Sequence, residues 1–112
     1  MKCYSVVIGA RNSRRRWTRR DERTAQEITL RHFPAGCSFL KVNGAWYDPE
    51  AGSFRREEAR EIVVTTRSAA KLNAWCQELG RALGQRELLV LAKGTARRLR
   101  VGRAARNLRR IS

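Results

Sequence analysis

The chain has few of the residue types that small metal-binding and catalytic proteins use. It contains one histidine, His32, and three cysteines, Cys3, Cys37 and Cys76, that are widely separated. No two of these cysteines are close enough in sequence to form a metal knuckle, and an odd number cannot all pair as disulfides. We therefore expect no metal site and three reduced thiols, two of them among apolar neighbours.

Long hydrophobic runs are also missing. The longest apolar stretch, Leu88 to Ala92, has the length of a strand, whereas a membrane-spanning helix needs about 20 apolar residues. The N-terminal residues Met1 to Tyr4 include no hydrophobic stretch of the kind found in a signal peptide or a lipid anchor. These absences predict a cytoplasmic protein that does not interact with a membrane.

Catalytic and cofactor motifs are absent too. The sequence has no P-loop, no dinucleotide-binding glycine pattern and no nucleophile elbow, so we predict no cofactor and no catalytic residue. His32 stands at a helix end, where its cation would favour the helix dipole. Carboxylates in the middle of the chain lie among arginines, which favours a solvated ion-pair surface over an acid–base pair; they are Asp48, Glu50, Glu57 and Glu58.

Positive charge is what the chain has in excess, at a formal +15. Residues 11–23 carry a net +5 and residues 93–112 a net +8, whereas residues 24–92 carry only +1. Because like charges oppose compaction, two arginine segments around a nearly neutral body need an explanation. One is the codon bias of a GC-rich genome. The other is selection for phosphate contacts, since guanidinium groups bind phosphate bidentately.

We favour a nucleic-acid interface over codon bias. Trp17 lies inside the first arginine segment, and single-stranded nucleic-acid sites combine charge along the backbone with rings that stack on bases. Alternatively, Trp17 anchors the segment to the core. Contacts would go mostly to the phosphate backbone and would be weakly specific. The predicted nucleic-acid-binding residues are Arg14, Arg15, Arg16, Trp17, Arg19, Arg20, Arg97, Arg98 and Arg100.

Two other functions stay open. The chain could be an interaction module or an inhibitor that docks on an acidic protein, because basic proteins are steered onto acidic surfaces. It could also be a small-molecule enzyme of the dimeric α+β barrel type, with His32 or a loop carboxylate as the base. The charge pattern supports a binding role more than catalysis.

Periodicity predicts strands over residues 2–9, 37–42, 61–66 and 86–92, and helices over about 21–33 and 68–83. This β-α-β-β-α-β order predicts a ferredoxin-like α+β domain over residues 1–95, with an antiparallel sheet and two helices on one face. The other face would be solvated or meet a partner, including a second copy. Residues 96–112 would form a basic extension: an edge strand, a helix or a disordered segment. Unless it folds back or a dimer forms, the two arginine segments begin at opposite ends of the sheet.

Several local signals refine these elements. Thr24 and Glu27 have capping-box spacing, which favours a later start for the first helix. Ser68 is the predicted N-cap of the second helix, whose apolar stripe includes Trp75. Asn43-Gly44 and residues 49–52 are turn signals. Residues 45–48 would extend or return the strand that precedes Asn43. We favour core packing for Trp46 and Tyr47, and an exposed stacking or partner surface is the alternative.

Residues 32–39, His-Phe-Pro-Ala-Gly-Cys-Ser-Phe, lead into Gly44-Ala45-Trp46 and then into an Arg-Glu pair, Arg56-Glu57, before the strand at residues 62–64. Over residues 4–92 this pattern resembles a bacterial family of small α+β domains of unknown function. The resemblance implies a ferredoxin-like fold and no known activity. The two arginine segments are not part of the family pattern.

Overall fold

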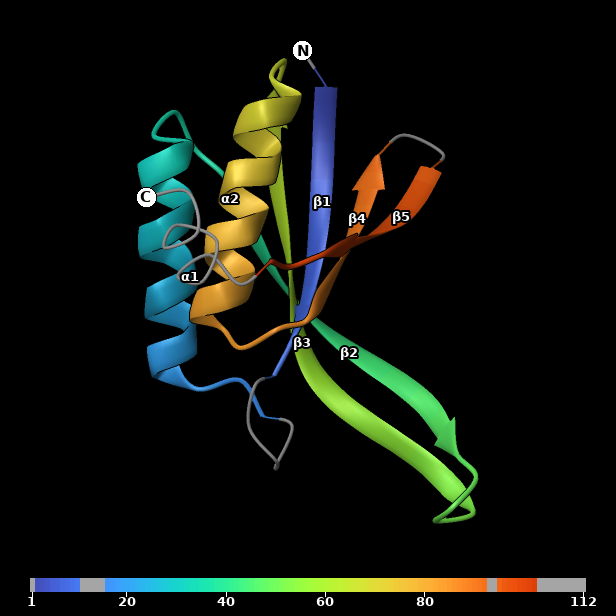
Figure 1. Cartoon of the computed structure of the whole chain (residues 1–112). Helices are drawn as coiled ribbons and strands as arrows, with labels where there is room; N and C mark the ends of the chain where they lie inside the picture. The colour runs from blue at the N-terminus through green and yellow to red at the C-terminus, as the bar shows by residue number, and fades with distance from the viewer. Residues whose placement is uncertain (1, 11–15, 93–94, 103–112) are drawn as a thin grey trace.

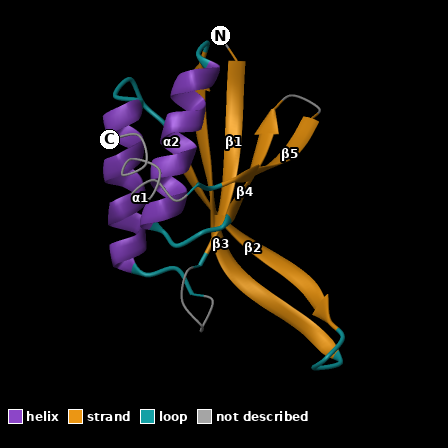
Figure 2. Ribbon diagram, viewed as in Figure 1, coloured by secondary structure: helices purple, strands orange, loops and turns teal. Residues whose placement is uncertain are grey.

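The computed structural model describes residues 2–10, 16–92 and 95–102. In chain order the elements are β1 (Lys2–Gly9), α1 (Arg19–His32), β2 (Ser38–Asp48), β3 (Ser53–Thr66), α2 (Ala69–Ala82), β4 (Glu87–Ala92) and β5 (Thr95–Arg100). The five strands form one antiparallel sheet in the order β2-β3-β1-β4-β5. Both helices cover the same face of the sheet (Figures 1 and 2). The fold is therefore α+β and ferredoxin-like, as predicted, with a fifth strand at one edge.

The core lies between the helices and the sheet. Alternate residues of β1 and β3, such as Val6, Ile8 and Ile62, are fully buried beneath the helices, as expected when one face of a sheet is covered. Trp75 of α2 is also fully buried, and its Nε1 donates a hydrogen bond of 3.0 Å to Thr29 Oγ1 of α1. The indole therefore fills the core without leaving its polar atom unpaired.

The first helix begins earlier than the sequence suggested. Thr18 is its N-cap: Thr18 Oγ1 accepts from the Asp21 backbone N–H, and Asp21 Oδ2 accepts from the Thr18 backbone N–H, both at 3.1 Å. The capping box at Thr24 and Glu27 was a wrong prediction. Thr18 and Asp21 have the same spacing as Thr24 and Glu27, and the helix uses the earlier pair. That pair directly follows Trp17, whose buried side chain fixes the start of the helix at the edge of the core. The Ser68 cap of α2 is confirmed.

The β2–β3 hairpin is longer than predicted. Asn43 and Gly44 lie inside β2, opposite Glu58 and Glu57 of β3, so a turn there was a wrong prediction. The ladder of eleven consecutive cross-strand pairs runs from Ser38–Val63 to Asp48–Ser53 and so continues past both residues. The chain turns instead at residues 49–52, where Gly52 takes a φ of 64° and Asp48 accepts backbone hydrogen bonds. The distal part of this hairpin, residues 44–57, projects away from the helices (Figure 1); we call it the arm.

The chain folds back after β4. Residues 95–100 form β5, which pairs with β4 from Ala92–Thr95 to Glu87–Arg100. Of the options that the sequence left open for the extension, the edge strand is therefore present over its first residues. Val101 then packs against α2, where a Cβ on Gly80 would overlap the Val101 side chain.

Candidate nucleic-acid interface

All six described arginines that were predicted to bind nucleic acid are exposed. Arg16 precedes α1, and Arg19 and Arg20 lie in its first turn. Arg97, Arg98 and Arg100 lie on β5. The predicted contacts of Arg14 and Arg15 fall outside the described residues.

The return of β5 brings the two arginine segments to one end of the sheet. β1 ends at Gly9, which leads into the first segment, and Gln85 Nε2 donates to the Gly9 carbonyl oxygen at 3.2 Å. Glu87, two residues later, pairs with Arg100 at the end of β5. We call this the Gly9 end of the sheet. Figure 1 shows the last turn of α2 between the start of α1 and the end of β5. The segments are thus not held at opposite ends of the fold.

A hollow at the Gly9 end is lined by arginines that belong to different elements. Arg81 comes from the last turn of α2, Arg86 from the residues before β4, and Arg100 from β5. The hollow has a volume of ≈ 890 Å³, and Glu87 is its only acidic lining residue among those described. Its backbone is fixed by the Val101 N–H, which donates to the Arg86 carbonyl oxygen at 2.8 Å. We call Arg81, Arg86 and Arg100 the arginine triad.

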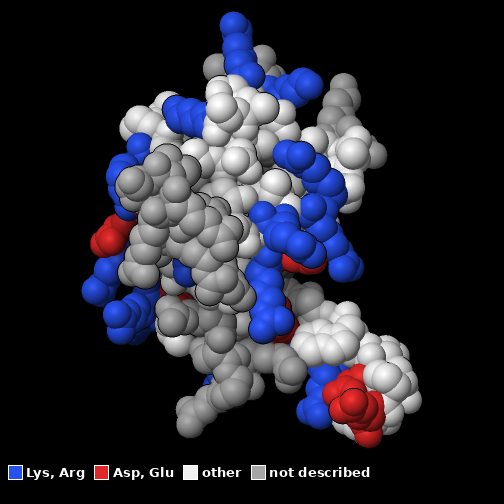
Figure 3. All heavy atoms as spheres, viewed as in Figure 1, with Lys and Arg blue, Asp and Glu red and all other residues white. Residues whose placement is uncertain are grey.

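Sequence reasoning missed two members of the triad. Arg81 and Arg86 belong to the nearly neutral central region, and their charge carried no signal there. They join Arg100 only because α2 ends, β4 begins and β5 ends at the same place. Figure 3 shows Lys and Arg side chains on the side of the molecule where β4 and β5 lie, and further ones on the opposite side, where the helices lie.

Carboxylates do not neutralise the triad within the described part of the chain. The ion pairs there join Arg31 and His32 to Glu78, Arg55 to Asp48, Arg60 to Glu22 and Arg98 to Glu87. Only the last involves β5. It spans 3.8 Å between side chains that are 81% and 47% exposed, a geometry in which an ion pair contributes little. None of the ion pairs within the described residues therefore involves Arg81, Arg86 or Arg100.

Trp17 does not present its ring to solvent. The side chain is 8% exposed and belongs to the core cluster. The Arg60 guanidinium lies over the ring, 5.2 Å from its centroid, and the Trp17 backbone N–H donates to Glu58 Oε2 at 2.7 Å. The prediction that Trp17 stacks on a base was wrong, because burying the indole stabilises the fold more than exposing it would. The alternative prediction, an anchor for the basic segment, is the one that the structure bears out.

Other candidate groups have structural contacts. His32 Nε2 lies 2.8 Å from Glu78 Oε1 and links α1 to α2; hydrogen bonds from His32 and Arg31 hold the pKa of Glu78 below its ordinary value. Hydrogen bonds from the Ala51 backbone and the Arg55 side chain lower the pKa of Asp48. Burial raises the pKa of the Cys76 thiol to about 11, which keeps it protonated and unreactive.

Trp46 and Tyr47 do not lie in the core, contrary to prediction. They are 39% and 54% exposed, and Phe54 opposite Tyr47 is 74% exposed. The reason is their position on the arm, beyond the reach of the helices that cover the rest of the sheet (Figure 1). Tyr47 and Phe54 pack edge to face with ring centroids 5.4 Å apart.

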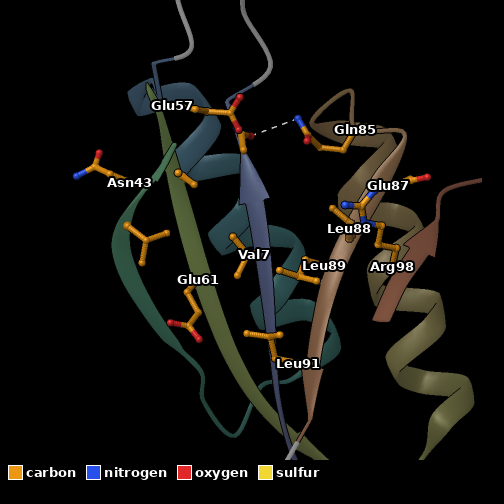
Figure 4. A pocket seen from close by; sticks show the side chains of 14 residues that line it. Val7, Asn43, Glu57, Glu61, Gln85, Glu87, Leu88, Leu89, Leu91 and Arg98 are labelled. Atoms are coloured by element: carbon orange, nitrogen blue, oxygen red, sulfur yellow. Dashed lines mark hydrogen bonds and ion pairs between the residues drawn. The ribbon is translucent and has the colours of Figure 1, made fainter. Parts of the chain in front are cut away.

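The sheet face opposite the helices carries a second hollow of ≈ 470 Å³, which we call the sheet hollow. Val7, Leu89 and Leu91 form its apolar floor, and Glu57, Glu61 and Glu87 add carboxylates. Figure 4 shows the Val7, Leu89 and Glu61 side chains on the same side of the sheet. Arg98 is the one basic residue in its described lining, so carboxylates outnumber cations on this apolar surface and do not favour a polyanion.

Comparisons with known proteins support the fold. A phage SAM lyase in the apo state is 14% identical, with a TM-score of 0.60, and the match covers 89% of each chain. The same enzyme in complex with S-methyl-5'-thioadenosine is 13% identical, with a TM-score of 0.57 over 89% of this chain and 90% of that chain. CutA from Synechococcus elongatus is 17% identical, with a TM-score of 0.51 over 86% and 80%.

No protein-family model and no curated protein matches the chain. The resemblance to a family of unknown function over residues 4–92 therefore stays a prediction. What the chain shares with the phage lyase and CutA is a small α+β architecture. Neither described helix is long and apolar enough to cross a membrane.

Proposed function

We propose that the protein binds nucleic acid at the Gly9 end of the sheet, through phosphate contacts with little sequence preference. The observation that carries this proposal is the arginine triad: guanidinium groups from α2, from the loop before β4 and from β5 line one hollow, which has a single carboxylate among its described lining residues. Folding of the domain does not require three arginines at one hollow, because neighbouring like charges destabilise a compact state. Phosphate oxygens satisfy guanidinium groups in geometry as well as in charge.

The contacts would read the backbone and not the bases. Trp17 is buried, so the aromatic ring expected beside the arginines does not supply stacking. Arginine contacts to phosphate fix position on the nucleic acid without reading sequence. The exposed arginines of the two segments that flank the triad, Arg16, Arg19, Arg20, Arg97 and Arg98, would extend the contact along the backbone. We therefore expect similar affinity for unrelated sequences.

A salt titration tests the proposal. Binding of nuclease-treated protein to a generic DNA duplex is measured by fluorescence anisotropy at several salt concentrations. For duplex DNA the log–log slope falls by about 0.9 for each phosphate contact. The variant Arg86→Gln/Arg100→Gln should reduce the slope by up to about 1.8, because two such contacts are removed.

The matched control is Lys2→Gln/Arg67→Gln, which removes the same charge at the other end of the sheet, where Lys2 pairs with Thr66. This control should leave the slope close to that of the wild type. Equal effects of the two variants would show that net charge, not the triad, drives binding. No binding at low salt would overturn the proposal, and nuclease-resistant retention of an acidic protein would replace it with the protein-partner alternative.

A further inference from the structure

The arm presents an apolar face that nothing in the described chain covers. Cross-strand pairing places Tyr47 opposite Phe54 and Ala45 opposite Arg56, so these four residues share one face of the hairpin. Tyr47 is 54% and Phe54 74% exposed. Figure 3 shows the projecting lobe as mostly neutral, with small groups of basic and acidic side chains. The rings thus remain in water although they pack on each other.

The sheet hollow is complementary to that arm face. Its floor is apolar, with Leu89 still 38% exposed. Within the described residues, Glu57 and Glu61 at the hollow form no ion pair. The arm face likewise offers two rings and one cation, Arg56, that has no carboxylate partner there. Apolar groups with a free cation on one surface match apolar groups with free anions on the other.

We infer that the protein self-associates by laying the arm of one copy across the sheet hollow of a second copy. The Tyr47 and Phe54 rings cover the apolar floor, and Arg56 meets Glu61. The contact cannot form within one chain. The sheet hollow lies beside the base of the arm, the arm extends away from it, and continuous strand pairing prevents the arm from folding back. None of the triad arginines lines the sheet hollow, although Glu87 lines both hollows and Arg98, a proposed nucleic-acid contact, lines the sheet hollow.

The buried area is sufficient only if each copy both gives an arm and receives one. A buried aromatic side chain contributes about 150–250 Å², so two rings contribute at most about 300–500 Å². A stable interface takes about 800 Å² from each partner. In a closed assembly every copy both gives an arm and receives one, which doubles the area buried per copy. An open series of the same contacts would grow into filaments.

Sedimentation equilibrium of the nuclease-treated full chain at physiological salt tests the inference. The wild type should have a mass that is two or more whole multiples of the chain mass of 12.9 kDa, and Tyr47→Ser/Phe54→Ser should sediment as a monomer. The matched control is Leu30→Ser, which removes a leucine that is 47% exposed on α1 and should assemble as the wild type does. Far-UV circular dichroism checks that each variant is folded.

Exchanging the charges of Arg56 and Glu61 distinguishes the specific arm contact from non-specific hydrophobic aggregation. Arg56→Glu and Glu61→Arg should each weaken association by about tenfold or more, in keeping with one interfacial charge pair, and the double variant should restore it. A monomeric wild type, assembly of the Tyr47→Ser/Phe54→Ser variant, or failure of the double variant to recover would each overturn the inference. The Arg86→Gln/Arg100→Gln variant should assemble normally, which separates this result from the fate of the proposed function.

Discussion

The body of the sheet and the arm are built from the same two strands but have opposite surroundings. In the body, Ile62 and Val64 of β3 lie under the helices and are at most 1% exposed. In the arm, Phe54 of the same strand is 74% exposed. Strand pairing continues without a break from one region to the other. The comparison teaches that hydrogen bonding extends the hairpin, whereas helix cover decides which of its large apolar residues become core.

The largest expected effect contrasts the two regions directly. Trp75→Ala should lower the free energy of unfolding by about 3–5 kcal/mol, because a fully buried ring is lost and a cavity is left. Phe54→Ser should change it by less than about 0.5 kcal/mol. Urea denaturation of dilute protein measures both. A large loss for Phe54→Ser in the monomer would show that the arm stabilises its own chain.

A smaller effect tests whether the end of β5 belongs with the covered region. Gly80→Ala should cost about 1–3 kcal/mol, because its new methyl group overlaps Val101. In a Val101→Ala background the same change should gain up to about 1 kcal/mol, since alanine is the better helix former. The double-mutant cycle measures the contact between α2 and Val101, the residue that follows β5. Additive effects in the cycle would contradict it.

The smallest expected effect on the free energy of unfolding concerns Glu78, which links the two helices that cover the body of the sheet but not the arm. The pKa of Glu78 is lowered in the folded state by His32 and Arg31, so its contribution is present above its ordinary pKa of 4.5 and is lost as the pH falls through the lowered folded value. Glu78→Gln should cost less than about 1 kcal/mol near neutral pH and flatten this part of the acid transition. Glu50→Gln, an exposed carboxylate on the hairpin turn, is the control. Identical acid transitions for wild type and Glu78→Gln would contradict the expected linkage.

Helices and buried strands could be predicted because their signals are local. Each of these signals depends only on neighbouring residues: the apolar stripe around Trp75, the Ser68 cap and the β-branched run at residues 62–64. The arm could not be predicted from the sequence. Asn43-Gly44 is a turn signal in isolation, and only cross-strand pairing with Glu58 and Glu57 overrides it. The candidate site was half predictable: the sequence marks the terminal arginines as runs of charge, whereas Arg81 and Arg86 are isolated arginines in a balanced region.

The sequence by itself determined the α+β class, the order of the elements and the surplus of arginine at both ends, because periodicity and charge are properties of neighbouring residues. Only the tertiary structure decided which arginines meet, that Trp17 is buried, and that Tyr47 and Phe54 are not. Those outcomes depend on where β5 returns and where the helices stop covering the sheet. Contacts of this kind join residues distant in the chain, and no local pattern records them.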